Sequence, residues 1–125
     1  MDRILIVDDE FLIRYTLEEG LKDRGYDAYS AATVEEGLEF VRKYHPGVLL
    51  LDNLLENSVG MDEIVNFKNA DEELQVIMMT AYGSVSQAVE ATKRGAYDYI
   101  LKPFDTQMVL SRIRTAVNEE SAQNH

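Results

Sequence analysis

Short apolar runs alternate with longer amphipathic stretches along the whole chain. Most of the runs are continuous rather than alternating, which is typical of strands in a parallel sheet, because both faces of such strands are covered. The predicted strands lie at residues 4–7, 28–31, 48–51, 76–79 and 98–101. The run at 28–31 is the weakest, so we expect it near an edge of the sheet.

The stretches between these runs repeat apolar residues at the spacing of one helical face, and they predict five helices. Capping residues and glycines mark several of the helix ends. These signals are capping boxes at Thr33–Glu36 and Ser84–Gln87, a cap at Asp105, and stops at Gly25, His45-Pro46-Gly47 and Gly95. The residues that mark one face of each helix are, in chain order, Ile13, Leu17 and Leu21; Val34, Leu38 and Val41; Met61, Ile64, Val65 and Lys68; Val85, Ala88, Val89 and Thr92; and Val109, Leu110, Ile113 and Val117.

This alternation predicts an α/β fold, (βα)5, in which helices cover both faces of a doubly wound, five-stranded parallel sheet. The length of 125 residues suits one domain with a sizeable core. We assign the domain to residues 1–118. Residues 119–125 show no periodic apolar face, so we expect a tail or the start of a linker that frays.

Four of the predicted strands are followed by polar residues whose side chains can bind a ligand or take part in catalysis. Asp8 and Asp9 follow the first strand, Asp52 the third, Thr80 the fourth and Lys102 the fifth. A single acid in such a place can simply cap a helix or start a turn. In an open α/β sheet, however, ligands bind outside the carboxyl ends of the strands, and parallel strands bring all of these ends to one edge. The sequence therefore predicts one pocket that holds three acids, a hydroxyl and an ammonium group.

These groups together favour phosphoryl transfer. Carboxylates held close together repel one another, and a hard cation such as Mg²⁺ relieves that repulsion. Lys102 can pair with Asp52 and later with a phosphoryl oxygen, and Thr80 can donate a hydrogen bond to another such oxygen. Asp52 would then be the nucleophile and become an aspartyl phosphate. Asp8 and Asp9, adjacent in sequence, suit metal binding better than attack.

Composition excludes several other classes of function. The formal net charge is −11, which opposes direct binding of nucleic acid. Cysteine is absent, so neither a disulfide framework nor a thiolate metal site can form. With only His45 and His125, a multi-histidine metal site or a histidine-based triad is not expected. No apolar stretch approaches the length of a membrane span and no signal peptide opens the chain, so we expect a cytoplasmic protein.

Four short motifs surround the polar strand ends: Val7-Asp8-Asp9-Glu10, Leu51-Asp52 with Gly60 eight residues further on, Met79-Thr80-Ala81, and Lys102-Pro103-Phe104. At these residues the chain resembles the receiver domain of bacterial two-component response regulators, and the resemblance extends through Val117. Two segments look especially like receivers of the nitrogen-regulator type, Thr80-Ala81-Tyr82-Gly83 and Gly95-Ala96-Tyr97-Asp98-Tyr99.

The resemblance implies a role for each acidic residue. Asp52 would accept a phosphoryl group from the phosphohistidine of a histidine kinase. Asp9 and Asp52, with the backbone carbonyl of Leu54, would bind Mg²⁺ or Mn²⁺, and Asp8 would help through a water molecule.

The resemblance also implies how the signal is read. Thr80 and Lys102 would hold the phosphoryl group, and Tyr99 would turn inward as Thr80 is drawn to it. The Lys102–Pro103 peptide bond is expected to be cis, and the strand order to be the flavodoxin-like 2-1-3-4-5. The domain would catalyse only its own phosphorylation and dephosphorylation. Phosphorylation would control an output module, for this type an ATPase module and a DNA-binding module, and a homodimer is possible.

Two other readings remain open at the level of sequence. A stand-alone aspartate-nucleophile phosphatase usually needs a second acid two residues after the nucleophile, where this chain has Leu54. A degenerate receiver that acts only as a binding module would not need the complete set of polar residues found here.

One position departs from the family's pattern. Four residues after Asp52 the family usually has proline, and here Glu56 takes its place. The loop at 53–59 thereby loses a rigid φ constraint and gains a negative charge near an acidic site. Our hypothesis is that the loop is more mobile or that Glu56 adjusts metal affinity.

The second idea predicts that Glu56→Pro changes the affinity for Mg²⁺, which a calorimetric titration measures. An affinity equal to that of the unchanged chain would contradict it.

Overall fold

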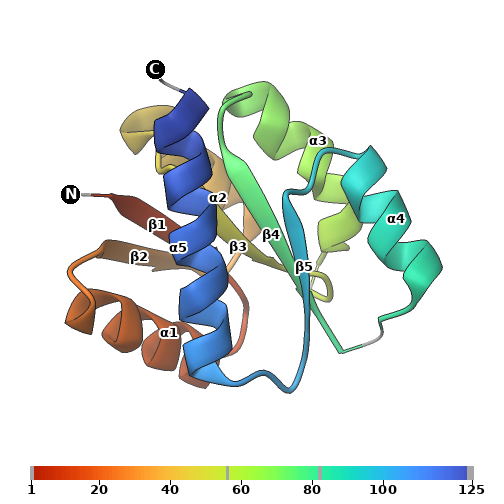
Figure 1. Cartoon of the computed structure of the whole chain (residues 1–125). Coiled ribbons are helices and arrows are strands. Elements are labelled where there is room, and N and C mark those ends of the chain that lie inside the picture. The colour runs from red at the N-terminus through yellow and green to blue at the C-terminus, as the bar shows by residue number, and fades with distance from the viewer. Residues whose placement is uncertain (1, 56, 82, 124–125) are drawn as a thin grey trace.

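The computed structural model describes residues 2–55, 57–81 and 83–123 of the chain. Within these residues five strands form one parallel sheet in the order β2-β1-β3-β4-β5, which confirms the (βα)5 prediction and the expected strand order (Figure 1). The strands are β1 (Arg3–Val7), β2 (Asp27–Ala31), β3 (Val48–Asp52), β4 (Gln75–Thr80) and β5 (Asp98–Leu101). The helices are α1 (Phe11–Asp23), α2 (Val34–Tyr44), α3 (Gly60–Ala70), α4 (Val85–Lys93) and α5 (Thr106–Gln123). The weak second strand lies at an edge, as expected.

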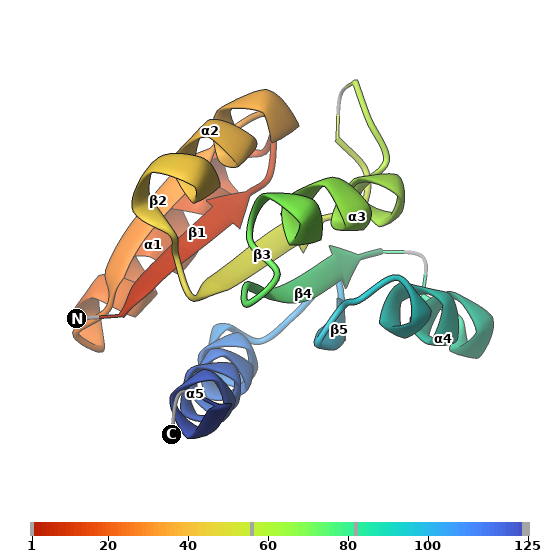
Figure 2. The same cartoon turned by 90° about the horizontal axis from the view of Figure 1, so that it is seen from above.

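Helices cover both faces of the sheet, and each face has its own apolar core. Successive strand residues point to opposite faces, so Ile4 and Ile6 belong to one core while Leu5 and Val7 belong to the other. The first core includes the buried residues of α1 and α5, and the second those of α2, α3 and α4. Figure 2 shows α2 and α3 on one side of the sheet and α5 on the other. All four residues of β3 before Asp52 are fully buried, which places that acid at the end of a rigid strand.

The predicted helix caps are present in the structure. Each supplies a side-chain oxygen to a backbone N–H that the first turn of a helix leaves without a partner. These bonds run from Glu36 N–H to Thr33 Oγ1 (3.2 Å), from Gln87 N–H to Ser84 Oγ (3.1 Å), and from Gln107 N–H to Asp105 Oδ1 (2.8 Å). Gly25 and Gly95 follow their helices with φ of +88° and +110°, values that L side chains rarely adopt.

The predicted apolar faces of two helices need correction. On α3, the predicted Ile64 is buried, but Val65 is 52% exposed, and Phe67, which was not predicted, is buried instead. On α4, Val85 is 84% exposed and Val89 47% exposed. Within the described part of α4 the one buried residue is Ala91. In both helices the apolar residues lie on more than one stripe, so periodicity alone did not decide which stripe is buried.

The C-terminal residues differ from the expected fraying, while their assignment as a tail or the start of a linker stays a prediction. Helix α5 continues to Gln123, so the backbone at 119–123 is helical rather than frayed. The domain boundary at residue 118 stays a prediction.

Phe67→Ala should lower the free energy of unfolding by about 3–5 kcal/mol, because it leaves a cavity in a closed core. Val65→Ala on the same helix should change it by less than about 0.5 kcal/mol, since that side chain faces solvent. Urea unfolding followed by circular dichroism measures both values. Equal losses for the two variants would contradict the orientation of α3.

Candidate functional site

The three predicted acids converge at the carboxyl edge of the sheet. Asp8 and Asp9 follow β1, and Asp52 is the last residue of the neighbouring strand β3. One carboxylate oxygen from each of the three lies within 4.8 Å of the others. Asp8 is 0% exposed and Asp52 4% exposed, so their charges lie largely out of water. Hard divalent cations bind such oxygen clusters, so the donor set fits Mg²⁺.

Lys102 lies between two of these acids. Its Nζ is 3.0 Å from Asp8 Oδ2 and 3.1 Å from Asp52 Oδ1. The pairing with Asp52 confirms the sequence prediction, whereas the pairing with Asp8 was not foreseen. Burial opposes the ammonium charge, but the hydrogen bonds to Asp8 and Asp52 outweigh that effect and raise the pKa of Lys102. One cation thus faces three acids, and the pocket keeps an excess of negative charge.

The surroundings of Asp52 change the pKa of its carboxyl group. Burial, followed by the neighbouring charge of Asp8, raises the pKa of Asp52 to about 6, although Lys102 acts in the opposite direction. The ionised form of Asp52 is therefore disfavoured in the folded protein. A cation bound beside it would favour the ionised form.

Thr80 and Tyr99 lie on the adjacent strands. Thr80 ends β4 and is 1% exposed. Tyr99 pairs in register with Met78, so Tyr99 and Thr80 point to the same face of the sheet. The Tyr99 hydroxyl donates a hydrogen bond to Gln87 Oε1 on α4 at 3.1 Å. This tyrosine is therefore a half-buried side chain linked to α4, not a loose surface aromatic.

Two small cavities adjoin the acids. One of about 190 Å³ is bounded by the two members of the ion pair, Asp52 and Lys102, together with Glu10, Leu54 and Ala81. Its size suits a phosphoryl group beside the Asp52 carboxylate. Leu54, whose backbone carbonyl is the predicted fourth metal ligand, thus borders the same space.

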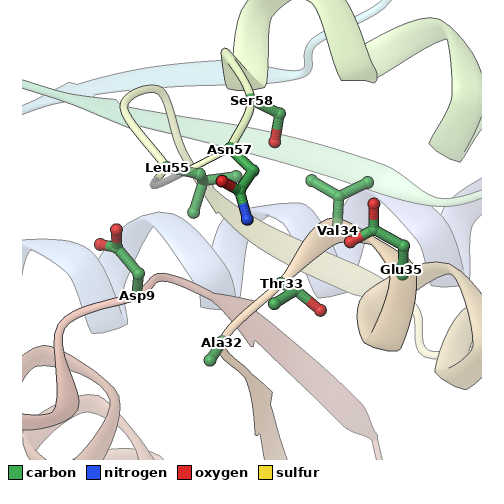
Figure 3. A pocket seen from close by; sticks show the side chains of 8 residues that line it. All are labelled: Asp9, Ala32, Thr33, Val34, Glu35, Leu55, Asn57 and Ser58. Carbon is green, nitrogen blue, oxygen red and sulfur yellow. The ribbon is translucent and has the colours of Figure 1, made fainter.

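The other cavity, of about 110 Å³, is lined by Asp9 together with the loop after β3 and the start of α2. Figure 3 shows Asp9 at one end of it, with Leu55 and Asn57 of the loop after β3 facing Thr33 and Val34 at the start of α2. Asp9 is thereby bordered by open space rather than packed by neighbours.

Several residues that shape the site were missed from the sequence. Glu10 lines the cavity, and its N–H donates to Asp8 Oδ1 at 2.9 Å. The Arg14 guanidinium donates to the carbonyl of Asp8 at 2.7 Å. Asn53 is 8% exposed. A polar residue directly after a buried strand was the one available signal for Asn53.

The predicted cis peptide bond between Lys102 and Pro103 is present. Glu56, where proline was expected, lies outside the described residues. Among the described residues, no helix combines the length and apolar character needed to cross a bilayer.

Residues 4–114 match the family model described as the response regulator receiver domain. The chain belongs to this family. It is thus the receiver domain of a two-component response regulator, a signalling switch rather than a conventional enzyme.

Individual relatives agree with this assignment. The chain is 36% identical over 118 residues to sporulation initiation phosphotransferase F of Bacillus subtilis, covering 94% of this chain and 92% of that protein. It is 34% identical to the beryllofluoride-activated NtrC4 receiver domain dimer, with a TM-score of 0.90 and coverage of 96% and 99%. It is 31% identical to NtrX from Brucella abortus solved with ATP, with a TM-score of 0.90, covering 98% of this chain and 28% of that one. These likenesses confirm the resemblance to nitrogen-regulator-type receivers.

Many of the curated relatives are longer than this chain. It spans about half of the length of several transcriptional regulators that it matches.

Asp52→Asn should stabilise the cation-free protein at pH 7.5 by about 2–3 kcal/mol, because it removes a charge that the fold disfavours. Below about pH 4 the Asp52 carboxyl group is protonated in both the folded and the unfolded protein, so it costs no stability. Because folding raises its pKa to about 6, that stability is lost as the pH rises through about 6. The difference between the variant and the unchanged chain should therefore vanish near pH 4. Urea unfolding in EDTA at both pH values measures it.

The exposed acid Asp23 supplies the control, since Asp23→Asn should leave stability nearly unchanged at both pH values. A loss of stability for Asp52→Asn at pH 7.5 would contradict the electrostatic account.

Proposed function

We propose that this domain is a phosphoacceptor switch in which Asp52 takes a phosphoryl group from the phosphohistidine of a histidine kinase. The observation that carries the proposal is the placement of Lys102, which lies 3.1 Å from Asp52 at the rim of a cavity that the two residues share. A carboxylate nucleophile beside a fixed cation suits phosphoryl transfer, where positioning and charge neutralisation supply most of the catalysis.

The residues divide the chemistry between them. An Asp52 carboxylate oxygen attacks phosphorus, the bond from phosphorus to the imidazole nitrogen of the kinase breaks, and an acyl phosphate forms on Asp52. Lys102 exchanges part of its pairing with Asp52 for a phosphoryl oxygen. The Thr80 hydroxyl, at the end of the adjacent strand, donates to another oxygen.

The same edge of the sheet would hold the metal. Asp9 and Asp52, with the backbone carbonyl of Leu54, are the proposed ligands of Mg²⁺, and Asp8 would act through water; Mn²⁺ can take the same place. When bound, the cation neutralises charge on the transferred group. The cluster of three carboxylates supports this assignment.

The proposed output is a shift between two conformations. Thr80 and Tyr99 would relay phosphorylation to the surface formed by α4, β5 and α5. The exposed residues Val85, Val89 and Leu101 give that surface apolar contact area. A homodimer and an attached output module, an ATPase with a DNA-binding module, are the proposed readers. The NtrX chain solved in complex with ATP, of which this domain matches about a quarter, supports an attached ATP-binding module. We place the protein in the cytoplasm as part of the same proposal.

Incubation with acetyl phosphate and Mg²⁺ should add one phosphoryl group to the protein, read by intact mass. Asp52→Asn should abolish the addition, because it removes the nucleophile. Asp23→Asn, which changes an exposed acid on α1, should be phosphorylated normally. EDTA should also prevent the reaction. Labelling that persists in Asp52→Asn would refute the site.

A further inference from the structure

Asn53 is a buried polar residue directly after Asp52, and it is bonded in three directions. Its N–H donates to the carbonyl of Met79 at 2.8 Å, and its own carbonyl accepts from Gly60 N–H at 2.7 Å. Its side-chain Oδ1 accepts from Met61 N–H at 3.0 Å. Because Met61 offers a donor there, the side-chain atom that faces it must be the amide oxygen.

Two of these bonds, those from Gly60 and Met61, take the place of a side-chain cap on α3. The residue in the capping position, Val59, has no side chain that can accept a hydrogen bond. The first N–H groups of a helix lack partners within it. Asn53 supplies acceptors to two of them, those of Gly60 and Met61. A residue of the strand end thus acts as the cap of a helix that begins seven positions later.

Backbone contact strengthens the link between the strand end and the helix. A Cβ on Gly60 would lie 2.3 Å from the carbonyl oxygen of Asp52 and 3.0 Å from Asn53 Cα. Real side chains do not tolerate such contacts, so only glycine fits here. The first turn of α3 lies directly against the backbone of Asp52, the proposed phosphoacceptor.

Residues of the loop between Asn53 and Gly60 also bond to one another. Leu54 forms an isolated antiparallel bridge with Val59, and Leu55 N–H donates to the carbonyl of Ser58 at 3.0 Å. Leu54 and Asp52 border the same cavity. In sequence, Asn53 lies between the two residues proposed to bind the cation after β3, and its backbone carbonyl and its side chain both accept hydrogen bonds from the first turn of α3.

We propose that Asn53 is a positioning residue for the divalent cation: its side-chain oxygen holds the first turn of α3 and thereby fixes the Asp52 carboxylate and the Leu54 carbonyl relative to each other. The inference rests on the proposed function, since it assumes that this site binds Mg²⁺. Groups that orient metal ligands commonly affect metal affinity strongly although they do not touch the metal.

The test compares Asn53→Ala with Asn53→Asp. Alanine keeps the charge of the site unchanged but removes the acceptor, so the Kd for Mg²⁺ should rise about tenfold in calorimetric titration. Aspartate keeps an oxygen within reach of Met61 N–H, so Mg²⁺ affinity should return to at least that of the unchanged chain. Hydrogen exchange at the Met61 amide should be faster in the alanine variant and protected again in the aspartate variant.

A purely structural role for Asn53 would lower the stability of the protein and leave the Mg²⁺ affinity of the folded chain unchanged. Titrations are therefore made at a temperature where circular dichroism shows each variant folded. Arg94→Gln provides the control. Arg94 also bonds to the first turn of α3, through the Met61 carbonyl at 3.2 Å and Asp62 Oδ1 at 2.9 Å. It is not one of the residues that line the cavity beside Asp52. Its loss should change the Kd for Mg²⁺ by less than twofold.

An unchanged Kd in Asn53→Ala would overturn the proposal. An equal loss in Arg94→Gln would overturn it too, because general loosening of α3 would then be the cause. Affinity regained in Asn53→Asp without protection of the Met61 amide would show that charge acts, not position. If the unchanged chain itself fails to bind Mg²⁺, the proposed function fails, and that outcome is distinct from all of these.

Discussion

Asp8 and Asp52 are both almost fully buried, and one lysine separates their charges. Two carboxylates taken out of water repel strongly unless a cation lies between them. Lys102 compensates only part of the charge, because Asp9 adds a third carboxylate to the cluster. Burial, and after it the charge of Asp8, raises the pKa of Asp52 to about 6 despite the pairing with Lys102. The net negative charge of the three carboxylates and Lys102 suits the divalent cation that we propose this site binds.

The sheet makes this arrangement possible. Asp52 ends a fully buried central strand, Asp8 follows the strand beside it, and Lys102 follows the edge strand β5, reaching past β4. Because each residue follows a strand that is buried or paired in register, little backbone freedom remains at the site. The loop after β3 is the exception, since its described residues form one isolated bridge, between Leu54 and Val59, and no helix or longer strand. Asn53 anchors that loop by joining the end of the strand to the first turn of α3.

Much of this could be predicted from the sequence because it depends on the backbone. Continuous apolar runs located the strands, and parallel strands bring polar residues such as Asp52 and Lys102 to one edge whatever the details of packing. The strand order was implied by the resemblance to receivers rather than by the pattern. What could not be predicted depends on side-chain geometry: the bond from Lys102 to Asp8, the cap that Asn53 provides across a loop, and which stripe of α3 and α4 is buried. Helical periodicity alone allows either Val65 or Phe67 to face the core, and only side-chain packing decides which of the two is buried.

The most direct test of the central claim is a crystal structure of the domain with Mg²⁺ and beryllofluoride, the ligand present in the activated NtrC4 dimer. The account predicts beryllium bonded to an Asp52 carboxylate oxygen, the metal bound by Asp9, Asp52 and the Leu54 carbonyl, and fluorines accepting from Lys102 and Thr80. A metal bound elsewhere, or no adduct on Asp52 at saturating ligand, would contradict it.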